Sequence, residues 1–367
     1  MKRALTLAAR GKGGTSPNPA VGAVVVRGRR IIAEGWHKKA GEPHAERIAL
    51  EKAGVKAKGA TLYVTLEPCC HHGKTPPCTD IIIQSGVSRV VTAVRDPFKK
   101  VSGKGIRILK QAGVEVIENV LREDAARLNE DFFTFHRYKR PFVTLKWAMS
   151  LDGRTSTDTA HSKWITSEKS RRYSHKLRSR YDAIVAGIGT VLADNPRLTV
   201  RLPRYRGRQP LRVILDPRLE TPENAALFED PSGIILAAGK RAARRSEHKH
   251  ILKKKGAKIL PIPLKNGSLS IIPLLRELYN KGVQSLYVEG GRRVAGSFFK
   301  SGYVDKIIVF MAPKIIGGIQ ATSPLIFKGP AETPRMGLLE NIKTRRIDDD
   351  ILIEGYVRED FRKKELT

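Results

Sequence analysis

Cysteine and long apolar runs are both scarce in this chain. Only three cysteines occur in 367 residues, and all three lie within ten positions. An odd, clustered set excludes a disulfide framework and indicates a metal site or catalysis. No segment is apolar enough for long enough to span a bilayer, and the N-terminus lacks the apolar stretch and cleavage site of a secretory signal. We therefore expect a cytoplasmic protein with no membrane partner.

Acidic residues are also few, with 36 Asp and Glu against 68 Lys and Arg, which gives a net charge of +32. A chain of this charge attracts polyanions. The excess does not form a tail, because it falls in separate runs with few aromatic residues, such as 169–180, 201–208 and 240–255. Such runs are typical of solvated helix faces and loops. We do not expect a nucleic-acid partner, although nucleic-acid binding stays an alternative.

The length and the alternation of apolar segments indicate two α/β domains with a boundary near 139–141. In the first half we expect strands over 21–26, 31–36, 60–68, 87–94 and 114–120, and helices over 44–53, 78–86, 105–113 and 122–139. In the second half we expect a strand that begins near 141, strands within 182–196, 211–217, 233–239, 257–264, 284–291 and 304–318, and helices over 271–282 and from about 294.

The clustered cysteines lie downstream of a His-x-Glu motif, in "HAE" and "EPCCHHGKTPPC". A catalytic zinc site takes three nitrogen or sulfur ligands and keeps one open position, and His44, Cys69 and Cys78 supply that set. A proline precedes both His44 and Cys78, as is common where a helix begins. The helix N-terminus then favours the thiolate form that binds zinc. Glu46 can accept a proton from metal-activated water and pass it to a leaving amine.

A closed structural zinc site is the alternative interpretation of these residues. Such a site would take a fourth ligand, and Cys70, His71 and His72 are all close in sequence. The general signature of zinc deaminases joins H-x-E to P-C-x-x-C. This chain departs from it in one respect, because eight residues separate Cys69 and Cys78 when Cys70 is counted in the gap.

In the second half, no G-x-G-x-x-G follows a predicted strand, so a Rossmann site is not indicated. Two predicted strands instead lead into glycines, at Gly187-x-Gly189-Thr190 and at Gly290-Gly291. Glycines before a helix N-terminus let backbone N–H groups approach phosphates closely. Tight turns and close strand–helix packing need the same glycines. The residues alone leave both interpretations open.

Taken together, the motifs resemble the family of bifunctional riboflavin-biosynthesis deaminase–reductases. The first half carries "SPNPAVGAVVV", "HAE" and the long cysteine gap, and the second carries "LKWAMSLDGRTS", "YVEGG" and "APKIIGG". The resemblance implies an α/β fold of two domains. Residues 1–140 would form a cytidine-deaminase-like α/β/α layer that acts as a zinc-dependent pyrimidine deaminase. Residues 141–367 would form an NADPH-dependent reductase with a dihydrofolate-reductase-like mixed sheet and flanking helices.

The resemblance also implies roles for single residues in the deaminase half. His44, Cys69 and Cys78 would bind one zinc, and Glu46 would be the catalytic proton shuttle. Cys70 stands where a serine is expected, so it is a candidate for an adventitious ligand or an oxidation site. The remaining positions that look like substrate contacts are Asn18, His37, His71 and Lys74.

In the reductase half the implied positions form two sets, and no proton donor is assigned. The arginines of the substrate set would bind the ribose phosphate, since the planar guanidinium suits phosphate oxygens. The substrate set is Ser162, Arg178, Leu198, Arg201 and Glu289. The NADPH set is Ala148, Trp164, Thr190, Asp194, Gly291, Arg292, Arg293, Val294, Ala295, Gly296 and Ser297.

These expectations combine into a reaction sequence. The implied substrate is a small phosphorylated pyrimidine, 2,5-diamino-6-ribosylamino-4(3H)-pyrimidinone 5′-phosphate, which the first half would deaminate with zinc-activated water. The second half would then use NADPH to reduce the ribosyl group to ribityl. We also expect a homo-oligomer. The alternative function is a polynucleotide deaminase, acting on tRNA or single-stranded DNA, with an accessory anion-binding domain.

Overall fold

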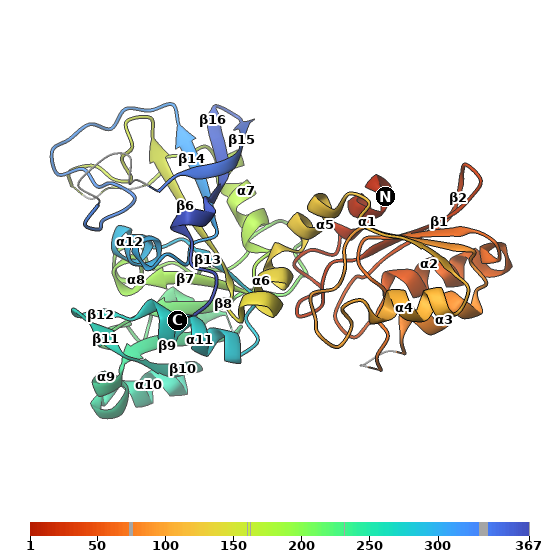
Figure 1. The fold of residues 1–367 in the computed structure, drawn as a ribbon. Helices are drawn as coiled ribbons and strands as arrows, with labels where there is room; N and C mark the ends of the chain where they lie inside the picture. The colour runs from red at the N-terminus through yellow and green to blue at the C-terminus, as the bar shows by residue number, and fades with distance from the viewer. Residues whose placement is uncertain (73–75, 160, 162, 231, 330–336, 367) are drawn as a thin grey trace. The chain divides into compact units, whose positions relative to one another are not determined.

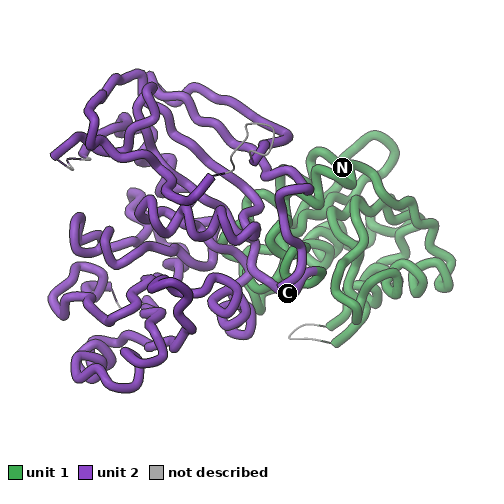
Figure 2. The backbone as a smooth tube through the Cα atoms, turned by 60° about the vertical axis from the view of Figure 1, so that its left-hand side comes forward, with its two compact units in different colours: residues 1–137 green, residues 138–367 purple. Residues whose placement is uncertain are grey.

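The structure is a computed structural model that describes every residue except 73–75, 160, 162, 231, 330–336 and 367. The chain divides into two compact units, Met1–Arg137 and Tyr138–Thr367 (Figure 2). Each unit has its own sheet and its own hydrophobic core. None of the helices in the described part of the chain has both the length and the apolar character needed to cross a bilayer.

The first unit is built on a five-stranded sheet in the order β2-β1-β3-β4-β5. Figure 1 labels β1 and β2 of this sheet and the helices α2, α3 and α4. β1 pairs antiparallel with β2 and β3, whereas β3, β4 and β5 run parallel. The strands are β1 Gly22–Arg27, β2 Arg30–Trp36, β3 Thr61–Val64, β4 Arg89–Thr92 and β5 Glu115–Ile117. The helices are α1 Lys2–Ala8, α2 Ala45–Ala53, α3 Cys78–Gln84, α4 Lys104–Gln111, α5 Arg122–Leu128 and α6 Glu130–Tyr138.

Helices cover both faces of this sheet, which confirms the predicted α/β/α layer. Alternate residues of a strand point to opposite faces. Ala23 and Val25 pack with α2, α3 and α4 on one face, whereas Val24 packs against α1 on the other. α5 and α6 contribute Ala125 and Phe132 to a smaller cluster beside α1. The prolines and glycines of the sequence correctly marked the start of α3 and the ends of α2 and α3.

The single helix predicted over 122–139 is wrong, because the chain breaks it into α5 and α6 at Asn129. The Asn129 side chain is buried and accepts a hydrogen bond from the Ala20 backbone N–H at 2.8 Å, while its amide donates to the Ala20 carbonyl at 2.9 Å. A partner distant in sequence therefore fixes this break. Continuous amphipathic periodicity along the segment conceals it.

The second unit contains a nine-stranded mixed sheet in the order β10-β9-β8-β7-β13-β6-β14-β16-β15. The strands from β10 to β14 run parallel, and β16 and β15 close one edge antiparallel. The strands are β6 Phe142–Ser150, β7 Ala183–Gly187, β8 Leu211–Leu215, β9 Ile234–Gly239, β10 Ala257–Ile262, β13 Ser285–Val288, β14 Lys306–Ala312, β15 Leu339–Ile347 and β16 Asp350–Val357, with a small hairpin of β11 Leu264–Lys265 and β12 Ser268–Leu269.

Each face of the nine-stranded sheet carries its own core, as expected of a mixed sheet with flanking helices. Ile184 and Ile214 pack with α7 and α10, whereas Val185 and Val213 pack with α11 and α12. The two strands predicted to end in glycines are β7 and β13, and they pair with each other in the centre of the sheet. The helices are α7 Glu168–Arg178, α8 Ile188–Asp194, α9 Lys240–Arg245, α10 His248–Lys254, α11 Ile271–Asn280 and α12 Arg292–Ser301.

The C-terminal strands β15 and β16 have no counterpart in the elements expected from the sequence, which end at 318. β15 forms the edge of the sheet and most of its side chains are exposed. An exposed edge strand needs no alternation of apolar and polar residues, so the pattern that reveals a half-buried strand is absent. Its basic residues, among them Lys343 and Arg345, are typical of an edge that is protected from further pairing.

Candidate active sites

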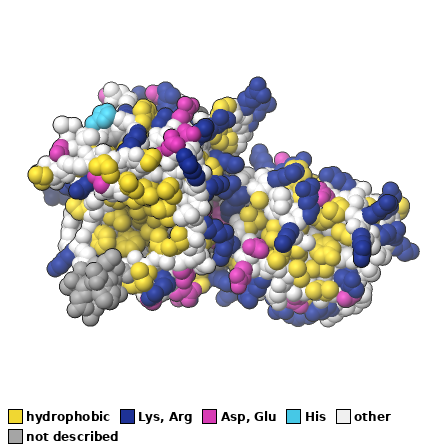
Figure 3. All heavy atoms as spheres, turned by 90° about the horizontal axis from the view of Figure 1, so that it is seen from above, with side chains coloured by type: hydrophobic (Ala, Val, Ile, Leu, Met, Phe, Trp, Pro, Cys, Tyr) yellow, Lys and Arg dark blue, Asp and Glu magenta, His cyan; other side chains and the backbone are white. Residues whose placement is uncertain are grey.

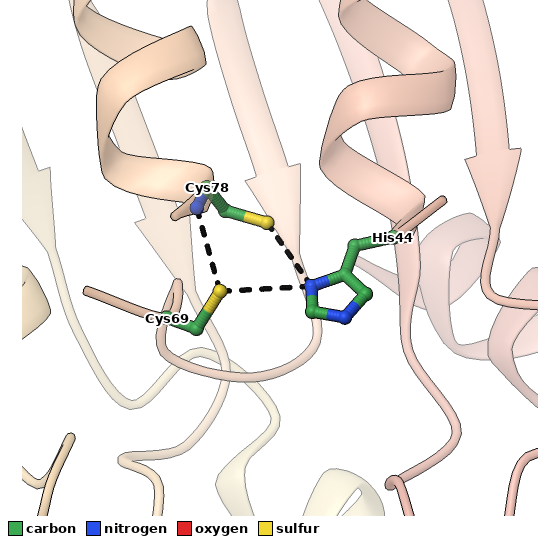
Figure 4. Close-up of side chains that lie close together, drawn as sticks. All are labelled: His44, Cys69 and Cys78. Atoms are coloured by element: carbon green, nitrogen blue, oxygen red, sulfur yellow. Dashed lines mark hydrogen bonds between the residues drawn. The ribbon is translucent and has the colours of Figure 1, made fainter. Parts of the chain in front are cut away.

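Three potential metal ligands converge in the first unit (Figure 4). His44 is the N-cap of α2, Cys78 is the first residue of α3, and Cys69 lies in the loop that follows β3. Nδ1 of His44 lies 3.3 Å from Sγ of Cys78 and 3.6 Å from Sγ of Cys69. The three ligand atoms all lie within 4.8 Å of one another. Two helix starts and one loop thus direct a nitrogen and two sulfurs at a common point.

The electrostatics of this cluster favour a thiolate at Cys69. The hydrogen bond from the Cys78 thiol outweighs burial and lowers the pKa of Cys69 to about 4, and His44 adds to the effect. The backbone N–H of Cys78, at the start of α3, also points to Sγ of Cys69 at 3.4 Å. The same thiol–thiolate bond and burial raise the pKa of Cys78. A divalent cation between the two sulfurs would ionise both.

Glu46 lies in the first turn of α2, two positions after His44, and its exposed fraction is only 4%. Burial raises the pKa of its carboxyl group, and the positive His44 partly opposes this. The carboxyl group also interacts with the Cys78 thiol. Glu46 is therefore a buried acid next to the ligands but outside the ligand set. A carboxyl group with a raised pKa can both accept and return a proton near neutral pH.

Behind the ligands, His37 and Asn18 form a hydrogen-bonded pair. Nδ1 of His37 lies 3.2 Å from the Pro43 carbonyl oxygen, which only an N–H can approach in this way, so Nε2 accepts from the Asn18 amide at 3.1 Å. The His37 ring is buried and contacts the His44 ring edge-on at 5.1 Å. Burial lowers the pKa of His37 and keeps the ring neutral. Both of its nitrogens are engaged, so His37 orients Asn18.

The donor set fits a catalytic zinc better than a closed structural one. Among the described residues, the group around His44 contains one histidine and two cysteines and no fourth ligand. The Cys70 sulfur points to the Lys100 carbonyl oxygen at 3.9 Å. His72 is exposed. One nitrogen and two sulfur ligands leave a fourth tetrahedral position open for water.

The remaining two predicted substrate contacts, His71 and Lys74, fall between Cys69 and Cys78 in the sequence. The His71 ring meets Phe98 edge-on at 5.8 Å, and its Nδ1 is buried with no hydrogen-bond partner within the described chain. A buried polar atom without a partner is costly, which fits a group that awaits a ligand. The prediction for Lys74 falls outside the described residues.

The second unit contains a pocket of about 780 Å³ at the carboxyl ends of its central strands. Ligands of open parallel sheets bind at this edge. Seven of the eleven predicted NADPH positions line the pocket, namely Thr190, Asp194, Gly291, Arg292, Arg293, Val294 and Ser297. Of the other four, Ala148 lies on β6, Trp164 is exposed with the Arg171 guanidinium 4.3 Å from its ring centre, and Ala295 and Gly296 lie within α12.

The structure separates the two interpretations of the glycines. A Cβ on Gly187 would lie 2.7 Å from Val294, and one on Gly290 would lie 2.7 Å from the Ala186 backbone, so these two glycines allow close packing. Gly187 also lines the pocket, as do Gly189 and Gly291, and at these last two a Cβ would meet no atom closer than 3.4 Å. Gly291 has a φ of +57°. Each glycine pair thus contains one packing position and one position that lets backbone approach a ligand.

Glu289, which follows β13 and lines the pocket, is held by Arg178 of α7. Nε and Nη2 of Arg178 donate to the carboxylate at 2.9 and 2.5 Å, and Nη1 donates to the Thr199 carbonyl at 3.0 Å. Burial opposes ionisation, but Arg178 and Lys146 together hold the pKa of Glu289 below its ordinary value. The Arg178 guanidinium is therefore engaged within the protein.

Sequence reasoning missed Lys146 and His175, both of which surround Glu289. Lys146 lies on β6 in "LKWAMS", and burial lowers the pKa of its ammonium group while Glu289 opposes the change. Burial, Arg178 and Arg201 lower the pKa of His175 to about 4, so it is neutral at physiological pH. A lysine within an apolar strand was the available signal for Lys146, because such a residue is rarely buried without a partner.

The other predicted substrate positions of this unit lie in different surroundings. Leu198 is buried in the core with a φ of +53°. Arg201 is exposed, and its backbone N–H donates to Nδ1 of His175 at 3.2 Å. Ser156 and Thr322 also line the pocket, and Oγ of Ser156 lies 2.8 Å from Oγ1 of Thr322. Neither residue was singled out from the sequence. The prediction for Ser162 falls outside the described residues.

These two sites and their folds define a bifunctional enzyme, in which a cytidine-deaminase-like hydrolase is joined to a dihydrofolate-reductase-like oxidoreductase. The sequence profile of the cytidine and deoxycytidylate deaminase zinc-binding region matches residues 1–94, and that of the RibD C-terminal domain matches residues 141–353. The chain belongs to the RibD family of riboflavin biosynthesis proteins. It carries a zinc-dependent deaminase and an NADP-dependent reductase.

The similarity extends over the whole chain. The riboflavin biosynthesis protein RibD of Aquifex aeolicus is 50% identical over 86% of this chain and 87% of its own length, and that of Bacillus amyloliquefaciens is 46% identical over 98% and 96%. The solved structure of Acinetobacter baumannii RibD has a TM-score of 0.87 at 36% identity and covers 98% of both chains. The alternative of a polynucleotide deaminase is not favoured, because these relatives share both units.

Proposed function

We propose that residues 1–140 deaminate 2,5-diamino-6-ribosylamino-4(3H)-pyrimidinone 5′-phosphate and that residues 141–367 then reduce the ribosyl group of the product. The observation that carries the proposal is the joint presence of an open three-ligand cluster with Glu46 and a glycine-lined pocket with Glu289. A deaminase–reductase from Thermotoga maritima whose name describes this pair of activities is 41% identical, with a TM-score of 0.83 over 98% of this chain.

In the deaminase unit we assign His44, Cys69 and Cys78 as zinc ligands. Zinc, when bound, supplies an activated water for attack on the amino-bearing carbon. Glu46 would accept the proton lost by this water and deliver it to the departing amino group. Its burial supports this role, since a raised pKa makes the protonated carboxyl group available as an acid.

Asn18, His37 and His71 would then fix the substrate ring. Because the Asn18 Nδ2 group donates to His37, we assign the Asn18 amide oxygen to the substrate and the His37 ring to the orientation of Asn18. The unpartnered Nδ1 of His71 is available for a polar group of the substrate. Lys74 remains a predicted phosphate contact from the sequence.

In the reductase unit NADPH supplies the hydride, and the protein positions the two reactants. We assign Glu289 to the ribosyl hydroxyl groups, with Arg178 and Lys146 fixing its charge and orientation. Arg178 therefore acts on the substrate through Glu289, and Arg201 is the arginine we assign to the phosphate. Leu198 would contribute by its backbone, and Ser162 remains a prediction from the sequence.

The NADPH site would be the 780 Å³ pocket. Its residues fit the cofactor, because Gly189 and Gly291 leave room for backbone approach and Arg292 and Arg293 add positive charge beside it. Asp194 and Thr190 offer polar groups to the ribose hydroxyls. Trp164 and Ala148 remain predicted contacts. The cytoplasmic location, the homo-oligomeric state and the absence of a nucleic-acid partner also remain predictions. Figure 3 shows one face of the molecule, on which Lys and Arg side chains lie over both units among other side chains.

A coupled assay tests the proposal. The zinc-loaded enzyme is supplied with the diaminopyrimidinone ribosylamine phosphate, with and without NADPH, and both ammonia release and NADPH absorbance are followed. We expect ammonia in both reactions and NADPH oxidation only after ammonia has appeared. The matched variants are Glu46→Gln and Glu51→Gln, which lie on the same helix, with Glu51 exposed. Ammonia release must fall by about 10²–10⁴-fold in the first and persist in the second. No ammonia from the wild type would refute the assigned substrate.

A further inference from the structure

The reductase pocket crosses three neighbouring strand ends in a fixed order. β13, β7 and β8 are adjacent and parallel, so their carboxyl ends lie side by side at one edge of the sheet. Glu289 follows β13, Gly187 ends β7 and is followed by Gly189, and Pro217 and Arg218 follow β8. All of these residues line the pocket. Since adjacent strands lie about 4.8 Å apart, Arg218 is separated from Glu289 by about 10 Å or more across the sheet.

This order assigns the parts of a dinucleotide to the pocket, provided that the proposed function holds. The nicotinamide must lie beside Glu289, because the hydride has to reach the substrate there. The pyrophosphate would then pass Gly189, Gly291 and Arg292, which line the pocket. The adenosine consequently reaches the β8 end, where Leu215, Leu269 and Ile271 line the pocket and offer an apolar surface to a base.

Arg218 is the cation at that adenosine end. It lines the pocket with a side chain that is 82% exposed, and its nearest acidic partner, Glu220, lies at 3.7 Å, which is long for an ion pair. Lys240 and Arg241 are exposed at the start of α9, which directly follows β9, the next strand of the sheet. The adenosine end is thus positive, although nothing in the nicotinamide or pyrophosphate chemistry requires a cation so far along the sheet.

We propose that Arg218 binds the 2′-phosphate of the NADPH adenosine and thereby gives the reductase its preference for NADPH over NADH. The guanidinium group can donate two N–H groups to phosphate oxygens, which a ribose hydroxyl cannot match in charge. Glu220 partly opposes the phosphate, so its charge limits the preference. Arg292 and Arg293 lie beside the pyrophosphate, which both cofactors share, and they therefore strengthen binding without selecting between them.

The test is equilibrium binding rather than turnover. Calorimetric titrations of the full-length enzyme compare NADP⁺ with NAD⁺, and 2′,5′-ADP with 5′-ADP, in the wild type, Arg218→Ala, Arg218→Lys and Glu220→Gln. We expect Arg218→Ala to weaken the binding of NADP⁺ and 2′,5′-ADP roughly tenfold, which is the size of one charge-assisted contact. The affinities for NAD⁺ and 5′-ADP should change little. Lysine should restore part of the loss, and Glu220→Gln should tighten NADP⁺ alone.

Two controls make the result decisive. Arg346→Ala removes another exposed arginine with an acidic neighbour, Asp349, outside the pocket, and should change nothing. Arg293→Ala should weaken both cofactors alike. An unchanged preference in Arg218→Ala, or an equal loss for both cofactors, overturns the assignment of Arg218. A wild type that binds neither cofactor contradicts the proposed function itself, so the two failures are distinguishable.

Discussion

The two active sites are built in opposite ways. The deaminase ligands come from one stretch, residues 44 to 78, and their geometry depends on two helix starts and one loop. The reductase pocket is lined by residues from Thr155 to Thr322, which include the ends of β7, β8 and the sequence-distant β13. A metal needs few donors of fixed chemical type, whereas a dinucleotide needs an extended surface. The first kind of site can be read locally, and the second cannot.

The sites also differ in how they control charge. In the deaminase cluster the hydrogen bond from the Cys78 thiol lowers the pKa of Cys69 to about 4, whereas burial raises the pKa of Glu46. In the reductase the key carboxylate, Glu289, is kept ionised by Arg178 and Lys146. In the roles proposed above, Glu46 moves a proton, whereas Glu289 presents a fixed charge to the substrate.

The largest expected effect comes from Cys69→Ser, which separates the two sites. Removing one of three protein ligands should abolish zinc retention and ammonia release, because a neutral hydroxyl group is a poor substitute for thiolate. Reduction of the deaminated intermediate should continue at the wild-type rate. Metal content by mass spectrometry and the two separate assays measure this. Cys70→Ser is the matched control and should retain zinc, since its sulfur points to the Lys100 carbonyl. Loss of zinc in that control would make Cys70 a ligand.

Glu46→Gln should have the next largest effect. A positioned acid–base group contributes about 10²–10⁴-fold to rate, so we expect deamination to fall by about that factor while zinc content stays unchanged. The glutamine has nearly the same shape, so folding should be preserved. Because the reductase has a separate site, this variant should reduce the deaminated intermediate at the wild-type rate when that intermediate is supplied. A variant that lost zinc as well as activity would show that Glu46 is structural.

The third prediction concerns the stability of the reductase unit alone. Arg140 and Asp305 are both 1% exposed and form a paired contact at 2.7 Å, and Asp305 also accepts from the Val143 N–H. Asp305→Asn leaves the buried guanidinium without its counter-charge, which costs about 3–5 kcal/mol. Calorimetry should show a lower unfolding temperature for the reductase unit alone. At temperatures below that transition, an ammonia assay should show that zinc-dependent deamination is retained. The exposed pair Arg346–Asp349 offers the control, since Asp349→Asn should change stability by less than about 1 kcal/mol.

The smallest effect is a pH dependence of the reductase unit that arises from His175. Its pKa is about 4 in the folded chain and about 6.5 when unfolded. Between these values the unfolded state binds more protons, so stability rises with pH and is lost as pH falls from about 6.5 towards 4. His175→Gln should reduce this acid sensitivity by about 1 kcal/mol or less, because solvent screens a partly exposed ring. Urea titrations at pH 5 and pH 7.5 measure it, and an unchanged difference between the two would contradict the assignment.

Much of the fold could be predicted from the sequence, though with clear gaps. The β/α alternation located most central strands, because buried strands carry continuous apolar residues. The break between α5 and α6 was missed, since Asn129 and Ala20 are far apart in the chain. The edge strand β15 was missed because its exposed side chains carry no pattern. Periodicity therefore located many of the elements that bury a face, although α1 and β16, which also bury residues, were missed. It fails where a distant partner or solvent decides the structure.

By itself, the sequence determined the metal chemistry of this protein. Only a few residue types bind zinc, and the spacing of His44, Cys69 and Cys78 along the chain is enough to recognise them as a ligand set. It also determined that glycines end two central strands. Only the tertiary structure decided which glycines serve packing, that Arg178 is committed to Glu289, and that Lys146 belongs to the same cluster. The physical reason is that donor type is a property of a residue, whereas the partner of a charge depends on which groups share its desolvated surroundings.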